Sequence, residues 1–284
     1  MYPYSVLFGL DLYTIFLCVG IISALVTFRV FSDRQKMYWK LQNFAILVGV
    51  ASIVCGYGSA VLFQGFYNFL ADTSKGFVLN NSTGSTFYGG LIGGVACFLL
   101  FYFTVGAFIF KDQIHVKKFF DIANIAAASI SVAHACGRLG CLMAGCCHGA
   151  ETNAWYGVYF VYYKIKAVPI QLFEAIFLFA LFALFCYRIA KKKSYNLPLY
   201  MALYGVWRFT VEFFRADDRG ATIVSFLSPS QLIALLMVLG SIGLFFGERY
   251  VQSKLRLADS DNAKEDAREE TIENIVEEEK DDED

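Results

Sequence analysis

Charged residues are scarce in this sequence. Lys, Arg, Asp and Glu together make up 17% of its 284 residues, whereas 57% of the residues are hydrophobic and 29 are Phe. Soluble globular domains carry about 25% charged residues, so the composition excludes that class. The sequence instead indicates an integral membrane protein.

Several familiar signals are also missing. The sequence has no glycine-rich nucleotide-binding loop and no basic nucleic-acid-binding surface, so we expect no soluble cofactor and no nucleic-acid partner. Met1 to Tyr4 contains no basic residue, and the apolar run that follows is too long for the core of a cleavable signal peptide. We therefore expect the first apolar segment to be a mature transmembrane helix.

Seven apolar stretches are long enough to cross a bilayer, at about 17 to 25 residues each. They are predicted at residues 6–28, 41–66, 89–110, 122–145, 169–187, 197–214 and 229–247. The loops on one side hold four, three, four and three Lys or Arg, and those on the other side hold one, two and two. The positive-inside rule then places the N-terminus outside and the C-terminus in the cytoplasm. We predict an all-α integral membrane protein with seven transmembrane helices.

The charge is distributed unevenly along the chain. Residues 259–284 hold 14 acids and 3 bases, which leaves 21 bases and 11 acids in the rest. Such an acidic segment with few aromatics indicates a solvated, mostly disordered extension. We therefore divide the chain into a transmembrane domain at 1–250 and a cytoplasmic tail at 251–284.

Three ionisable residues lie inside otherwise apolar stretches. Arg208 and Glu212 are one helical turn apart, and Arg138 lies among small and apolar residues. Charges at membrane depth are costly and mark functional sites. Two arginines and a glutamate therefore predict an anion-binding site, the simpler alternative for Arg208 and Glu212 being an ion pair that only neutralises itself.

Five motifs occur in an order that resembles the prolipoprotein diacylglyceryl transferase family over about residues 1–250. They are Phe87-Tyr-Gly-Gly-Leu-Ile-Gly93, Gly137-Arg-Leu-Gly140 with Gly149, Pro169-Ile-Gln-Leu-Phe-Glu174, Tyr204-Gly-Val-Trp-Arg-Phe-Thr-Val-Glu-Phe-Phe-Arg215 and Ser228-Pro-Ser-Gln231. The resemblance implies an enzyme of the bacterial plasma membrane that moves the diacylglyceryl group of phosphatidylglycerol onto the lipobox cysteine of a preprolipoprotein. Glycerol phosphate would leave, and the site would face the outer leaflet, between the third, fourth and sixth spans.

The resemblance also implies roles for the charged residues. Arg138 would bind the phosphate of the donor lipid, and Arg208 would stabilise the leaving glycerol phosphate. Arginine suits both tasks, because its planar fork grips phosphate through two hydrogen bonds. Glu212 would orient Arg208 from the same helical face. Arg215 would steer anionic head groups or act as an interfacial anchor.

Further residues are expected to bind or surround the substrates. Gln171 and Glu174 would form a scaffold for the site, with a cap or packing role as the alternative for Gln171. Tyr13 would lie near the site, or serve as a packing tyrosine. The glycines would make room for a lipid head group or allow close helix packing: Gly89, Gly90, Gly137, Gly140 and Gly149.

The chain departs from the family at the position of the proton acceptor. Tyr88 stands where the family usually has His in its Phe-His-Gly-Gly turn. Neutral tyrosine, with a pKa near 10, is a poor general base at pH 7. His134 and His148 are the local substitutes, and we favour His134 because it is four residues before Arg138 and hence on its helical face.

Cysteine replaces two polar residues of the family's fourth span. Cys141 and Cys146 stand where an amide and a carboxylate are common, so we expect them at the substrate-binding site. Together with Cys136, Cys147 and His148 they could bind a metal, form a redox pair, supply a nucleophile or pack as small residues. Because the spacing lacks the two-residue gap typical of structural zinc sites, we predict no metal site.

Three other functions remain open from the sequence. The chain could keep the lipid donor and use another acceptor, or it could hold an anionic lipid without turnover. It could also be a thiol or metal protein that reuses the scaffold. Retention of both arginines and Glu212 favours chemistry, whereas Tyr88 and the cysteines favour divergence.

Overall fold

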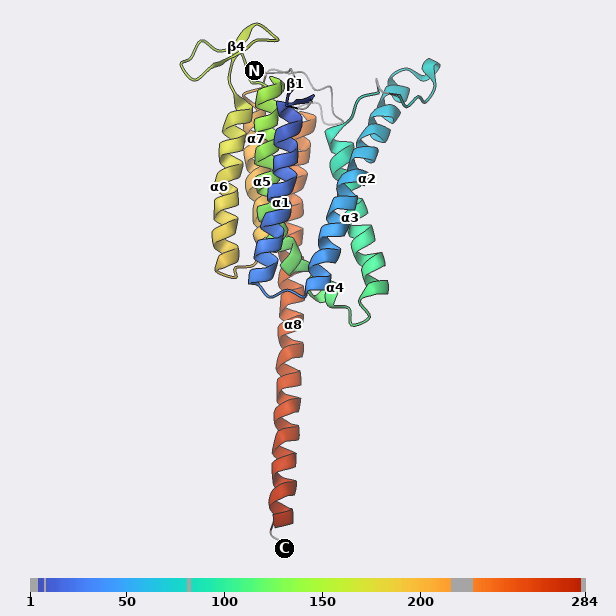
Figure 1. Ribbon diagram of the computed structural model, residues 1–284, viewed down its shortest axis with the longest axis vertical. Coiled ribbons are helices and arrows are strands. Elements are labelled where there is room, and N and C mark those ends of the chain that lie inside the picture. Colours follow the sequence, from blue (N-terminus) through green and yellow to red (C-terminus); the bar gives the residue numbers. More distant parts are fainter. Residues whose placement is uncertain (1–4, 8, 81–82, 216–226, 282–284) are drawn as a thin grey trace. The chain divides into compact units, whose positions relative to one another are not determined.

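Long helices dominate the computed structural model, which describes residues 5–7, 9–80, 83–215 and 227–281 (Figure 1). The helices are α1 (Leu12–Arg34), α2 (Trp39–Ala71), the 3-10 turn η1 (Thr73–Lys75), α3 (Phe87–Ile109), α4 (Ile114–Lys117), α5 (Phe119–Ala144), α6 (Ile170–Ala190), α7 (Asn196–Glu212) and α8 (Pro229–Asp281). Two small antiparallel hairpins accompany them, β1 (Ser5–Leu7) with β2 (Leu10–Asp11) and β3 (Val158–Phe160) with β4 (Ile165–Ala167).

Among the residues that the structure describes, six helices are long and apolar enough to cross a membrane. They are α1, α2, α3, α5, α6 and the part of α8 from Pro229 to Ala258. These helices confirm the prediction of an all-helical integral membrane protein. α7 covers the predicted sixth span but has only 17 residues, so the count of seven spans and their orientation stay predictions.

The first helix begins later than predicted. β1 pairs with β2 ahead of the helix, and Asp11 then caps α1 by accepting a hydrogen bond from the Thr14 amide at 3.0 Å. An Asp at this position satisfies an amide that has no partner within the helix. The apolar run that starts at residue 6 therefore includes a hairpin as well as a helix.

The last helix extends into the acidic segment. α8 continues as a helix to Asp281. Glu, Ala, Lys and Arg are strong helix formers, and the helix contains no proline after Pro229. The division of the chain at residue 250 stays a prediction.

The chain forms two compact units. One comprises Met1–Asn196 with Phe214–Asp217, and the other comprises Leu197–Phe213 with Asp218–Asp284. In the first unit α5 packs against both α1 and α6, and α2 packs against α3. In the second unit α7 lies beside α8, where a methyl group added at Gly205 would come within 3.0 Å of the Ala234 carbonyl oxygen.

Small residues let the helices of the first unit approach closely. A methyl group at Gly20 of α1 would lie 3.0 Å from the Ala133 carbonyl oxygen of α5. Between α2 and α3, a methyl group at Gly56 would lie 3.0 Å from the Gly90 carbonyl oxygen. Close backbone approach through glycine is a common packing mode in membranes.

An aromatic cluster joins α3 to α5 through the short helix α4. The Tyr102 hydroxyl donates to the His115 carbonyl at 2.7 Å, and both side chains are almost fully buried. Phe103 of α3 packs on Phe119 at the start of α5, with ring centroids 5.1 Å apart. This cluster lies at the start of α5, next to the basic segment 111–118. Cys141 lies near the other end of the same helix.

Candidate functional site

Arg138 and Glu174 form an ion pair between α5 and α6. Arg138 Nε lies 3.0 Å from Glu174 Oε1, and the two side chains are 15% and 1% exposed. A carboxylate this deeply buried requires a cation and hydrogen bonds. The predicted scaffold role of Glu174 thus has a concrete form, because it holds the guanidinium predicted to bind phosphate.

His134 faces the same carboxylate. Its Nε2 lies 3.8 Å from Glu174 Oε1, one helical turn from Arg138. The structure therefore brings together three residues that the sequence selected for different reasons. The distance allows an ion pair when the imidazole is protonated.

The turn after α5 carries the cysteines, and glycine permits it. Gly145 has a φ of 79°, the left-handed conformation that ends many helices. The Gly145 amide donates to the Leu142 carbonyl at 3.2 Å, and the Cys146 amide donates to the Cys141 carbonyl at 3.2 Å. This pair of bonds is a Schellman motif, which folds Cys146 back beside Cys141.

Gln171 fixes the same turn from α6. Its side-chain amide donates to the Cys146 carbonyl, and the Gln171 residue is 1% exposed. Gln171 and Glu174 are one helical turn apart, so the start of α6 supports both the cysteine turn and Arg138. The scaffold role of Gln171 stays a prediction.

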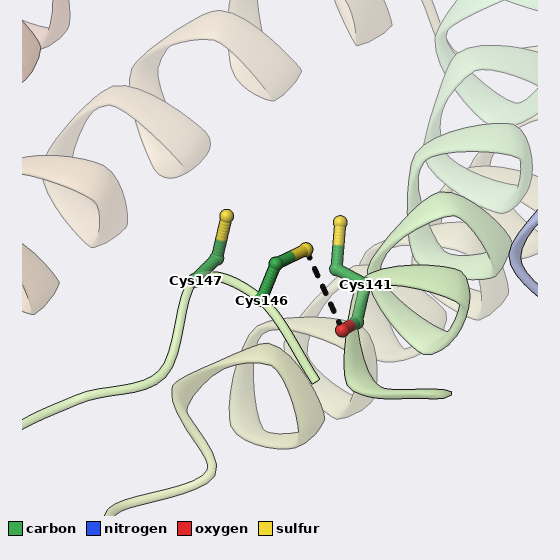
Figure 2. A group of neighbouring side chains, drawn as sticks. All are labelled: Cys141, Cys146 and Cys147. Atoms are coloured by element: carbon green, nitrogen blue, oxygen red, sulfur yellow. Dashed lines mark hydrogen bonds between the residues drawn. The ribbon is translucent and has the colours of Figure 1, made fainter. Parts of the chain in front are cut away.

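Three thiols gather at this turn (Figure 2). The Sγ atoms of Cys141, Cys146 and Cys147 all lie within 4.8 Å of one another. Hydrogen bonds from Cys141 and Cys146 lower the pKa of Cys147 well below its usual range, and the positive charges of Arg215 and Arg138 act in the same direction. Hydrogen bonds to the other two thiols raise the pKa of Cys146. The Cys146 thiol itself donates to the Cys141 carbonyl oxygen at 3.7 Å (Figure 2).

The segment after the cysteines pairs with two residues that follow α7, Phe214 and Arg215. Gly149 forms a β-bridge with Arg215, and the Ala150 amide donates to the Phe214 carbonyl at 3.1 Å. A methyl group at Gly149 would come within 2.7 Å of Ile170 and 3.0 Å of the Phe214 carbonyl oxygen. Glycine is therefore required at 149 for backbone packing, which also brings Arg215 close to the thiols.

The other predicted glycines separate into two groups. Gly89 and Gly90 pack against α2, and Ser59 donates to the Gly89 carbonyl at 2.9 Å. Gly140 packs against Tyr13, whose Cδ2 would lie 3.1 Å from an added methyl group. A methyl group at Gly137 would meet nothing within 4 Å. Of these four, only Gly137 adjoins open space.

Tyr88 lies in the first turn of α3, on a different helix pair from His134. α3 packs against α2, whereas α5 packs against α1 and α6. The structure thus places the residue that replaces the family's His on the α2–α3 pair. Tyr13, in α1, is 38% exposed and contacts α5 at Gly140.

The second unit contains its own buried arginine. Arg208 Nη2 lies 2.8 Å from Glu212 Oε2, and both side chains are 8% exposed. Arg208 Nη2 also donates to Ser230 Oγ at 2.8 Å. The i,i+4 pair predicted from the sequence is therefore present, and α8 adds a third partner that the sequence did not identify.

The start of α8 explains how Ser230 is positioned. Ser228 Oγ accepts from the Gln231 amide at 3.2 Å, and Gln231 Oε1 accepts from the Ser228 amide at 3.0 Å. This is a capping box with Pro229 at the first helical position. Ser228 Oγ also donates to Glu212 Oε1 at 2.8 Å. In the sequence, these contacts could have been predicted from the motif Ser228-Pro-Ser-Gln231.

Comparisons with known proteins identify the family. The family model described as prolipoprotein diacylglyceryl transferase matches residues 4–247. The chain is 31% identical over 249 residues to phosphatidylglycerol–prolipoprotein diacylglyceryl transferase 2 of Clostridium perfringens, covering 84% of this chain and 92% of the relative. It is 35% identical over 188 residues to phosphatidylglycerol–prolipoprotein diacylglyceryl transferase of Clostridium tetani, covering 64% of this chain and 68% of the relative. The chain therefore belongs to the prolipoprotein diacylglyceryl transferase family, and it is a multi-pass bacterial membrane enzyme of this type.

Proposed function

We propose that this enzyme transfers the diacylglyceryl group of phosphatidylglycerol to the lipobox cysteine thiol of preprolipoproteins and releases glycerol phosphate. The relatives' names specify phosphatidylglycerol and prolipoprotein. The residue assignments rest on an arrangement that two arginines have in common. Each of two arginines in the apolar helices is paired with a carboxylate, the partly buried Arg138 with Glu174 and the buried Arg208 with Glu212.

The Arg208 pair suits an anion better than a simple structural role. Within the part of the chain that the structure describes, the Nη1 atom of Arg208 is buried and has no hydrogen-bond partner. A buried donor without a partner is costly, and a phosphate oxygen would satisfy it. Glu212 and Ser230 meanwhile hold the other guanidinium nitrogen in place.

The reaction moves negative charge toward these cations. The acceptor thiolate attacks the glyceryl CH2 carbon, the bond from that carbon to the phosphate oxygen breaks, and the electron pair leaves with glycerol phosphate. Fixed guanidinium groups near the phosphate oxygens lower the barrier, because they are already oriented before the charge develops. We assign Arg138 to the phosphate of the donor and Arg208 to the leaving group.

His134 is the general base we propose for the thiol proton. Tyr88 replaces the histidine usual in the family, and neutral tyrosine is a weak base at pH 7. Histidine titrates near neutrality, and Glu174 lies 3.8 Å from the His134 ring, where it can orient the ring. We also propose that nine further residues take part in substrate binding: Gly89, Gly90, Gly137, Gly140, Gly149, Cys141, Cys146, Arg215 and Tyr13.

We place the site toward the outer leaflet of the bacterial plasma membrane, in a seven-helix protein with its N-terminus outside. α5 begins after a segment with Lys111, Lys117 and Lys118 and ends just after Cys141. Basic loops stay in the cytoplasm, so the positive-inside rule assigns the cysteine end of α5 to the outer side. Exported prolipoproteins present their lipobox on that side.

A transfer assay with the full-length enzyme tests the proposal. Purified protein would be incubated with phosphatidylglycerol and a lipobox peptide, while glycerol phosphate release and peptide mass are followed. We expect the peptide to gain a diacylglyceryl mass with wild type and not with Arg208→Ala. The matched control is Arg29→Ala, which removes an exposed i,i+4 pair with Asp33 at 3.2 Å.

The two alternatives give different results in this assay. Glycerol phosphate release without peptide lipidation would indicate another acceptor. Lipid binding that only weakens in Arg208→Ala, with no release by wild type, would indicate a non-catalytic lipid-binding protein.

A further inference from the structure

The three thiols at the end of α5 are partly exposed and lie together. Cys141, Cys146 and Cys147 come from the last turn of α5 and the turn that follows, and their sulfur atoms lie no more than 4.8 Å apart (Figure 2). The function proposed above assigns Cys141 and Cys146 a general role in substrate binding and gives Cys147 none. The cluster therefore needs its own explanation.

The backbone holds this cluster in a defined conformation. The Schellman motif at Gly145 places Cys146 beside Cys141, and Gln171 holds the Cys146 carbonyl. Cys147 has a φ of 60°, which non-glycine residues rarely adopt. Backbone outliers of this kind gather at functional sites, where the surrounding structure maintains them. The backbone that carries the three sulfurs is thus fixed by these contacts.

The separation of the sulfurs suits one metal ion. Zinc binds thiolates at about 2.3 Å, so three thiolates around a tetrahedral zinc stand about 3.8 Å apart. The widest separation permitted here, 4.8 Å, would need to close by about 1 Å. The three thiols therefore need only a small movement to surround one zinc ion.

Three protein ligands leave one coordination position open. His148, the next residue, is held elsewhere, because its Nδ1 lies 3.0 Å from the Gly149 carbonyl oxygen and its ring packs on Phe160 and Tyr163. Structural zinc sites have four protein ligands, whereas catalytic sites have three and keep the fourth position for water or substrate. Thiolate ligands select soft ions such as zinc.

Contrary to the expectation from the cysteine spacing, we propose that Cys141, Cys146 and Cys147 bind one zinc ion, and that its fourth position takes the thiol of the prolipoprotein acceptor. The second half rests on the proposed function. Cys141 is three residues after Arg138 on α5, and residues at this spacing are neighbours on a helix face. The acceptor sulfur would thus stand beside the cation assigned to the donor phosphate.

The zinc ion supplies the activation that Tyr88 cannot. A thiol that coordinates zinc loses its proton, which passes through water to His134 and then to the outer aqueous phase. The zinc-bound sulfur forms the bond to the glyceryl carbon, and the carbon–oxygen bond to phosphate breaks. Glycerol phosphate leaves with the electron pair, and the neutral thioether, a weaker ligand, dissociates from the metal.

Metal analysis tests the first half. Full-length protein purified in detergent under reducing conditions should contain one zinc per chain. Cys147→Ser should weaken zinc binding by more than the roughly 10- to 100-fold that loss of an outer-shell partner costs. The matched control replaces three other cysteines by Ser, namely Cys18, Cys97 and Cys186, and should keep its zinc. Folded wild type without zinc, or with a disulfide among the three cysteines, overturns the proposal.

X-ray absorption at the zinc edge tests the second half. Wild type should show three sulfur ligands and one lighter ligand, and addition of a lipobox peptide should raise the number of sulfur ligands to four. A peptide with Ser in place of the lipobox Cys should leave the number at three. If the number of sulfur ligands does not change when the cysteine peptide is added, the acceptor thiol does not bind the zinc ion. That result overturns the second half of the proposal.

The transfer assay separates this inference from the proposed function. Protein that lipidates the peptide but contains no zinc would keep the proposed function and overturn the inference. Protein that binds zinc and the peptide sulfur but transfers nothing would overturn the proposed function and keep the metal site.

Discussion

Arg138 on α5 and Glu174 on α6 lie 3.0 Å apart, and the glutamate side chain is almost inaccessible to solvent. The pair joins two helices whose residues the sequence had assigned separately to phosphate binding and to scaffolding. A buried ion pair contributes little net stability, but loss of one partner is costly. The pair therefore offers a way to separate structural from functional effects.

Replacement of one partner should destabilise the protein more than replacement of both. We expect Glu174→Gln to cost about 3 to 5 kcal/mol, because the buried guanidinium loses this carboxylate. The double variant Arg138→Met with Glu174→Met should unfold close to wild type. Thermal unfolding in detergent measures both, and the double variant should still transfer nothing. Normal turnover in the double variant would contradict the role of Arg138.

Lysine should not replace Arg208. The guanidinium contacts Glu212 and Ser230 through one nitrogen and keeps another for an anion. Lysine keeps the charge and loses this fork, so Arg208→Lys should lower turnover by about 10²- to 10³-fold. Ser230→Ala, which removes one hydrogen bond of about 1 kcal/mol, should lower it by only about fivefold. Equal turnover in wild type and Arg208→Lys would exclude Arg208 from the reaction.

Replacement by alanine should destabilise the protein at one glycine and leave its stability unchanged at another. A methyl group at Gly93 would lie 2.1 Å from Ser59 Oγ and 2.2 Å from Ser59 Cβ, so Gly93→Ala should destabilise the protein by about 1 to 3 kcal/mol. Gly137→Ala meets no neighbouring atom and should leave unfolding unchanged. If Gly137 makes room for the lipid head group, its variant should raise the KM for phosphatidylglycerol. An unchanged KM would assign Gly137 no part in binding.

The capping box should stabilise the start of α8. Ser228→Ala removes the bond to the Gln231 amide and the bond to Glu212, so we expect a loss of about 0.5 to 2 kcal/mol and a lower midpoint of thermal unfolding. Ser253→Ala, at an exposed position later in α8, is the matched control. Equal midpoints for the two variants would show that the cap contributes no stability.

A local pattern in the sequence predicted the pair of Arg208 with Glu212. Arg208 and Glu212 pair because residues four apart share a helical face, and the Ser-Pro-Ser-Gln motif begins a helix. Such contacts depend only on the geometry of one helix or one turn. The start of α1 was misplaced for the opposite reason, since apolar composition does not distinguish a short hairpin from the first turns of a helix.

The sequence alone determined that this is a membrane protein of helices, that two arginines lie within its apolar segments, and that its motifs follow one family. Tertiary structure decided that Glu174 pairs with Arg138 and faces His134. It also decided that Cys141, Cys146 and Cys147 meet at one point, through a left-handed turn that spacing did not reveal. Periodicity reports the face of a single helix, whereas a contact between helices depends on which faces pack together and in what register.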